Sequence, residues 1–65
     1  MRRVWIVTCM KAGFTYKILV ETTENGLWQY MESELPEAVK YSGATAEEVA
    51  AAKLLKMPIY LYKDI

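Results

Sequence analysis

Hydrophobic residues are dense at the start of the chain, and their pattern predicts a β-hairpin. Residues 4–10 are rich in β-branched and aromatic side chains and are apolar on both alternating faces, as in a strand with a neighbour on each side. Residues 11–13 form a short loop in which Gly13 takes the left-handed conformation that hairpin loops need. Residues 15–22 then alternate between two faces, which predicts the second strand.

The next segment has two interpretations. Asn25 and Gly26 both tolerate positive φ, which a type I′ turn requires at two positions, and they lie between two strand-like segments. This predicts a second hairpin, with a third strand over residues 27–31. The apolar residues of 27–35 also recur at helical spacing, which is the alternative. We prefer the strand, because Gly26 near a helix start would cost up to ~1 kcal/mol and Pro36 would end the helix early.

The second half of the chain contains a clearer helix. Residues 34–43 have no sustained period and are interpreted as a connection, with Val39 touching the core. Thr45 is the predicted N-cap of the helix, and Glu48, three residues later, completes a capping box. The apolar stripe of this helix comprises Ala46, Val49, Ala50, Leu54 and Met57.

The end of the chain completes the predicted fold. Pro58 stops the helix, and residues 59–62 alternate as a final strand. We therefore expect a single α+β domain over residues 1–65, a small antiparallel β-sheet with one main helix packed on one face, in the order β-β-β-α-β. If residues 27–32 are helical, the order becomes β-β-α-α-β.

The composition predicts a small core that needs support from a second copy. A chain of 65 residues buries only about 60% of the surface that it exposes when unfolded. Cys9 is the only cysteine and there is no histidine, so neither an internal disulfide nor a structural zinc site can stabilise the fold. We expect no metal and no cofactor. We expect a homodimer, because 54% of the residues are hydrophobic.

The N-terminal apolar run is not expected to be a targeting or membrane segment. It follows Arg2 and Arg3 but stops at Lys11, and no Ala-x-Ala-type cleavage site follows it. The run is also far too short to span a bilayer. Together with the lone thiol of Cys9, which fits a reducing compartment, this predicts a cytoplasmic protein.

No combination of residues typical of catalysis is found, and we expect the protein not to be an enzyme. Cys9 lies in the most apolar strand without a histidine to activate it. The acidic pairs Glu32/Glu34 and Glu47/Glu48 are explained by solvent exposure and by helix capping. The three glycines are scattered and form no phosphate-binding loop. No catalytic residue is therefore assigned.

An ordered series of short motifs runs from residue 16 to residue 56. A strand ending in Glu is followed by an acid-Asn-Gly turn, an aromatic strand, Glu-Leu-Pro, a valine, Gly-x-Thr and a Glu-Glu pair that opens a helix. The residues are Glu21, Asn25, Gly26, Trp28, Glu34, Leu35, Pro36, Val39, Gly43, Ala44, Thr45, Glu47 and Glu48. This series resembles the HicB-like antitoxin domain, although Glu37 stands where that family usually has glycine and the family's C-terminal DNA-binding segment is not found. The resemblance implies a small module that sequesters a partner protein, an RNA-cleaving toxin, through protein–protein contact.

Two classes of function follow from the surface residues. The first is protein binding, because Trp and Tyr are enriched at interface centres and are too numerous here to be all interior. The predicted partner-binding residues are Trp5, Trp28, Tyr30, Tyr60 and Tyr62. The alternative is nucleic-acid binding on the basic face of the N-terminal strands, with Arg2, Arg3, Lys11 and Lys17. We favour protein binding, because the net charge is zero; a steep salt dependence would indicate the alternative.

Overall fold

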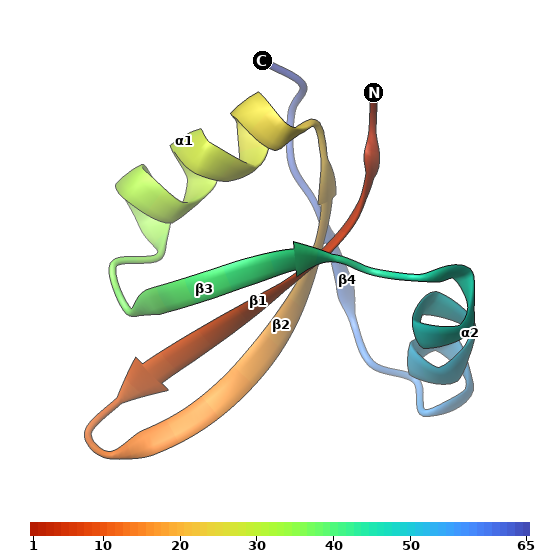
Figure 1. The fold of residues 1–65 in the computed structure, drawn as a ribbon, viewed down its shortest axis with the longest axis horizontal. Coiled ribbons are helices and arrows are strands. Elements are labelled where there is room, and N and C mark those ends of the chain that lie inside the picture. The colour runs from red at the N-terminus through yellow and green to blue at the C-terminus, as the bar shows by residue number, and fades with distance from the viewer.

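The computed structural model of the chain describes residues 1–65 and has an α+β fold with four strands and two helices (Figure 1). The elements are β1 (Arg3–Lys11), β2 (Phe14–Thr22), α1 (Glu24–Glu34), β3 (Ala38–Gly43), α2 (Ala46–Leu54) and β4 (Ile59–Leu61). The strands form one sheet in the order β3-β1-β2-β4. β1 is antiparallel to both of its neighbours, whereas β4 is parallel to β2.

The α+β class is confirmed, and the predicted order is wrong in part. The order is β-β-α-β-α-β in place of β-β-β-α-β, and the sheet is mixed rather than antiparallel. β2, β3 and β4 all run in one direction, because β2 and β3 are both antiparallel to β1 and β4 is parallel to β2. Parallel strands are usually joined by helical crossovers, so α1 connects β2 to β3 and α2 connects β3 to β4.

The first predicted hairpin is confirmed. β1 and β2 pair without interruption from Arg3 opposite Thr22 to Lys11 opposite Phe14. Gly13 has a φ of 82° and Ala12 a φ of 52°, so both loop residues adopt the left-handed backbone that a tight hairpin loop requires.

The predicted third strand is wrong, because α1 occupies this part of the chain. Thr23 is the N-cap of the helix, and its Oγ1 accepts a hydrogen bond from the N–H of Gly26 at 3.1 Å. Leu27, in the first turn, is fully buried. An N-cap contributes ~1 kcal/mol and the burial of a leucine ~2 kcal/mol, which together outweigh the ~1 kcal/mol cost of a helical glycine.

The segment interpreted as a connection contains β3, an edge strand. β3 pairs only with β1, from Trp5 opposite Gly43 to Cys9 opposite Ala38, with one irregularity in the register. Val39 is 56% exposed, so the prediction that it touches the core is wrong. An edge strand held by backbone hydrogen bonds needs little side-chain burial, which explains its weak sequence pattern.

α1 covers one face of the sheet, and the hydrophobic core lies between the two. We call this the α1 face and the opposite side the second face. The buried core residues are Trp5, Val7, Cys9, Val20, Leu27 and Leu35. Trp5 Nε1 donates a hydrogen bond to the carbonyl oxygen of Thr22 at 3.0 Å, so the one polar atom of this buried ring is paired.

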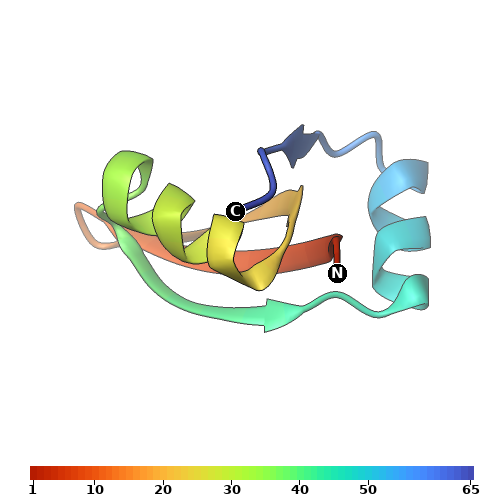
Figure 2. The ribbon, with the colours of Figure 1, turned by 90° about the horizontal axis from the view of Figure 1, so that it is seen from above.

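α2 begins as predicted but packs differently. Its capping box is confirmed: the N–H of Glu48 donates to Thr45 Oγ1 at 3.1 Å, and the N–H of Thr45 donates to Glu48 Oε1 at 2.9 Å. The helix lies beyond one end of the sheet, away from α1 (Figures 1 and 2). The predicted apolar stripe is therefore wrong: Ala52 is the buried residue, and Leu54 is 84% exposed. Neither helix has the length and apolar character needed to cross a membrane.

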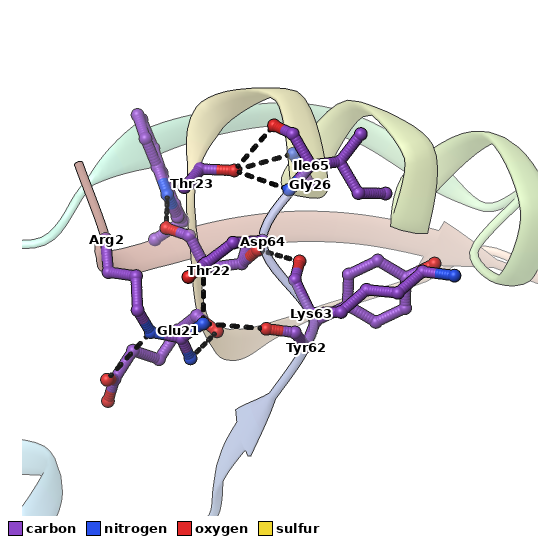
Figure 3. Close-up of polar contacts among 10 residues, drawn as sticks. Arg2, Glu21, Thr22, Thr23, Gly26, Tyr62, Lys63, Asp64 and Ile65 are labelled. Atoms are coloured by element: carbon purple, nitrogen blue, oxygen red, sulfur yellow. Dashed lines mark hydrogen bonds and ion pairs between the residues drawn. The ribbon is translucent and has the colours of Figure 1, made fainter.

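The C-terminal residues pass over the start of α1 and hold it in place (Figure 3). Thr22 Oγ1 donates to the carbonyl oxygen of Lys63 at 2.8 Å, and Thr23 Oγ1 donates to that of Ile65 at 3.2 Å. Arg2 donates to the carbonyl oxygen of Tyr62 at 3.0 Å and pairs with Asp64 at 2.6 Å. The position of α1 on the sheet is therefore fixed from the β4 side.

Candidate functional site

A groove of about 520 Å³ lies between α1 and β3. Six of its nine lining residues are hydrophobic. The nine are Trp28, Met31, Glu32, Leu35, Pro36, Ala38, Val39, Lys40 and Tyr41. An apolar hollow with a few polar groups at its border is the usual form of a binding site, which makes this groove the candidate functional site.

The helical side of the groove is one stripe of α1. The stripe consists of Trp28 and the residues three, four and seven positions after it, which are Met31, Glu32 and Leu35. Residues at these spacings share one side of a helix. Leu35 is buried and also belongs to the core. Trp28 is 57% exposed and offers a large apolar ring at the outer part of the groove.

The strand side of the groove is an unpaired sheet edge. The N–H of Ala44 donates to the carbonyl oxygen of Val4 at 2.9 Å, so these two residues form a hydrogen-bonded pair. Along an antiparallel ladder, such pairs alternate with non-hydrogen-bonded pairs. Tyr41 and Gly43 therefore fall on non-bonded positions, opposite Val7 and Trp5, and their backbone groups point away from β1. No strand pairs with this outer edge of β3.

Tyr41 ties the two sides of the groove together. Its ring packs edge-on against Trp5, with 5.6 Å between centroids, and against Trp28, with 5.9 Å. Its hydroxyl donates a hydrogen bond to Glu24 Oε2 at 3.0 Å, in the first turn of α1. This hydrogen bond to the Glu24 carboxylate raises the pKa of Tyr41, so the phenol stays protonated at neutral pH. The groove is preformed, because Tyr41 on β3 contacts Trp28 and Glu24 on α1.

The charges around the groove are divided between its two sides. α1 carries Glu24, Glu32 and Glu34 and no basic residue. β3 carries Lys40, which is opposite Thr8 and therefore on the second face of the sheet. No carboxylate pairs with Lys40, because both ion pairs of the protein are made by Arg2.

The structure separates the five predicted partner-binding residues. Trp28 is in the groove. Trp5 lies in the core. Tyr30 and Tyr62 pack against that core and against each other, with 5.0 Å between ring centroids. Tyr60 is 48% exposed on β4, at the opposite edge of the sheet.

The four predicted nucleic-acid-binding residues do not form one patch. Arg2 is engaged by Glu21 and Asp64, and the Arg3 guanidinium lies over the Trp5 ring at 5.1 Å. Lys11 lies at the other end of β1, and Lys17, opposite Thr8, is on the second face. Lys11 is eight positions after Arg3 along the strand, which corresponds to about 27 Å.

Cys9 and Tyr16 are reactive side chains that lie at paired positions of β1 and β2. Cys9 is fully buried, and burial raises the pKa of its thiol, which therefore stays protonated at neutral pH. Burial and the neighbouring Glu37 raise the pKa of Tyr16 to about 12. No group of three His, Cys, Asp or Glu residues is placed to hold a metal ion.

Sequence analysis missed most of the groove, and one signal was available. The helical alternative for residues 27–35 rests on Leu27, Tyr30, Met31 and Leu35, and it contains two of the groove residues, Met31 and Leu35. Nothing in the sequence indicated that residues 38–41 lie beside that stripe. Comparison with protein-family models, curated proteins and solved structures returned no match.

Proposed function

We propose that the protein is a binding module that takes up an extended segment of a partner protein. The segment adds to the free edge of β3 as a further strand and places alternate side chains in the groove between α1 and β3. The observation that carries the proposal is the coincidence of an unpaired strand edge with a preformed apolar groove along it. Strand addition of this kind combines affinity from backbone hydrogen bonds with specificity from side-chain pockets.

The two parts of the site supply different parts of the binding free energy. The outward-facing backbone groups of Tyr41 and Gly43 bond any strand of suitable register. Trp28, Met31 and Val39 offer apolar contacts to side chains that point toward α1. Trp28 is 57% exposed beside the groove. Tryptophan is one of the residue types that most often dominate the binding free energy at interfaces.

This proposal retains the class of function implied by the HicB resemblance, the binding of a protein partner, and a small RNA-cleaving toxin is one partner to test. It does not rest on that resemblance, since Asn25 and Gly26 begin a helix rather than a hairpin. We do not propose nucleic-acid binding, because Arg2, Arg3, Lys11 and Lys17 lie apart.

The proposal is tested with linear peptides selected from a displayed random library against the protein. Each selected peptide is resynthesised with N-methyl groups placed one residue at a time along its backbone. Because alternate N–H groups of an added strand bond to β3, N-methylation should weaken binding at every second position. In parallel, amide hydrogen exchange should slow at Tyr41 and Gly43 when the peptide is bound.

Two matched variants locate the peptide. Trp28→Ala should weaken binding at least about fivefold, as expected for an interface anchor worth ~1 kcal/mol or more. Leu54→Ala removes a side chain that is also exposed, but on α2, and should leave binding unchanged. The proposal is wrong if N-methylation shows no alternation, or if Leu54→Ala weakens binding as much as Trp28→Ala.

A further inference from the structure

A strand added to β3 has two environments for its side chains. Successive side chains of a strand point to opposite faces of the sheet. Those on the α1 face enter the groove, beside Trp28 and Met31. Those on the second face lie beside the β3 residues on that face, which include Lys40 and Ser42, opposite Thr8 and Ile6.

Lys40 lies in a cationic row on the second face. Thr8 of β1 has Lys40 on one side and Lys17 of β2 on the other, so the two lysines start about 10 Å apart, two strand spacings, on one face. No carboxylate forms an ion pair with either lysine. Glu48 of α2 is close enough to Lys17 for the lysine charge to contribute to the lowered pKa of Glu48, but the two side chains do not form an ion pair. Lys40, at the edge of the sheet, therefore has no ion-pair partner within the chain.

The helical side of the groove has the opposite sign. Glu32 is the one charged residue of α1 among the groove residues, and Glu24 and Glu34 lie on the same helix. An acidic side chain in the added strand is repelled there and attracted on the second face. Directly opposed charges in neighbouring strands contribute up to ~1 kcal/mol when opposite in sign and destabilise when alike.

We propose that Lys40 selects the segment that binds to β3, and that this segment carries an Asp or Glu on the side away from α1, between apolar residues that enter the groove. This inference rests on the proposed function and names the chemistry of the partner segment. Lys40 also disfavours a second copy at this edge. If two β3 strands paired antiparallel through their outward backbone groups, both Lys40 side chains would lie on one face and repel each other. Lysines on edge strands commonly prevent such pairing.

The test uses three versions of one selected peptide, which differ at a single residue on the second face: Glu, Gln or Lys. The wild-type protein should bind the Glu peptide about fivefold more tightly than the Lys peptide, the ratio that corresponds to ~1 kcal/mol. Lys40→Glu should reverse this order. Lys40 is exposed, so the substitution is not expected to prevent folding.

Lys53→Glu is the matched control, because it changes the net charge equally on exposed α2. It should leave the peptide order unchanged. If Lys40→Glu does not reverse the order, or if Lys53→Glu alters it to the same degree, the selecting role of Lys40 is wrong. Loss of the alternating N-methyl pattern would instead overturn strand addition itself, so the two failures are distinguishable.

Self-association gives a second measurement. Lys40→Thr keeps a strand-favouring residue and removes the repulsion, so it should add self-association through β3 and give a higher mass than the wild type in sedimentation equilibrium. Tyr41 and Gly43 amides should then exchange more slowly as the protein concentration rises. A mass equal to that of the wild type at every concentration would show that Lys40 does not protect this edge.

Discussion

Gly26 lies in the first turn of α1, where the C-terminal residues cross the helix (Figure 3). A methyl group at its Cα would lie 2.6 Å from the carbonyl oxygen of Lys63 and still closer to Thr22 Oγ1. Both atoms are held, because Thr22 Oγ1 donates to this same carbonyl oxygen. The glycine is therefore required by the close approach of two segments and not by a left-handed backbone.

Gly26→Ala should lower the free energy of unfolding by ~1–3 kcal/mol, the range for overpacking at a tight contact. Helix propensity alone predicts the opposite sign, a gain of up to ~1 kcal/mol. Chemical denaturation measures the difference. Asn25→Ala, one residue earlier and exposed, is the control and should change stability by only a few tenths of a kcal/mol. A stabilised Gly26→Ala variant would show that the C-terminal residues do not pack on the helix start.

Glu48 makes the capping box of α2 sensitive to acid. Its carboxylate accepts a hydrogen bond from the N–H of Thr45, which lowers the pKa of Glu48 below its usual 4.5. A carboxyl whose pKa is lowered by folding stabilises the fold above its unfolded pKa, and this contribution is lost as pH falls through the lower, folded value.

Glu48→Gln should therefore reduce the dependence of stability on pH between neutral pH and the folded pKa of Glu48. Urea denaturation at several pH values in this window gives the comparison. Glu47→Gln removes the neighbouring carboxylate, for which no such hydrogen bond exists, and should leave the slope nearly unchanged. Equal slopes for the wild type and Glu48→Gln would contradict the capping role.

At the scale of elements, both helices are capped by a threonine, and the two threonines differ in the number of hydrogen bonds that they form. Thr45 Oγ1 caps α2 through one hydrogen bond, from the N–H of Glu48. Thr23 Oγ1 caps α1 and also bonds the backbone of Ile65, accepting from its N–H at 3.3 Å and donating to its carbonyl oxygen. α1 is thus anchored by the chain end as well as by its own cap.

Thr45→Ala should cost ~1 kcal/mol, and Thr23→Ala should cost ~2 kcal/mol, because the second substitution removes the contacts to Ile65 as well as a cap. The midpoints and slopes of chemical denaturation measure both. Since α1 forms one side of the groove, Thr23→Ala should also weaken the binding of selected peptides, whereas Thr45→Ala should not. Equal losses of stability would mean that the C-terminal residues do not hold α1.

At the scale of the whole molecule, three leucines at the end of α2 and on β4 are exposed. Leu54 is 84% exposed, and Leu55 and Leu61 are each 74% exposed. A core this small leaves these side chains without partners, and large apolar residues left in water favour association. We expect a homodimer at micromolar concentration that buries exposed leucines, since Lys40 disfavours pairing through β3.

Sedimentation equilibrium should return twice the chain mass of 7.5 kDa. Leu54→Glu should shift the equilibrium toward the monomer without unfolding the protein, because the side chain is exposed in the single chain. Trp28→Ala, in the groove on the other side of the molecule, is the control and should leave the mass unchanged. A mass near that of one chain at every concentration would contradict the homodimer.

Local sequence was sufficient wherever neighbouring residues form the interaction. The β1–β2 hairpin follows from residues 4–22, because the left-handed loop and the two strands are adjacent in the chain. The capping box of α2 joins residues three apart, and Pro58 precedes β4 where the pattern predicted it. The α+β class follows from these elements, since two strands and a helix must bury their apolar faces against each other.

Tertiary structure decided the elements whose partners are distant in the chain. Residues 24–34 became a helix because Leu27 enters the core and Lys63 and Ile65 bond the threonines at its start. β3 became a strand through backbone bonds to β1, which no local periodicity reveals. The groove exists only because the α1 crossover lays its stripe along that edge, so the sequence by itself determined the side chains of α1, and the tertiary structure decided what they face.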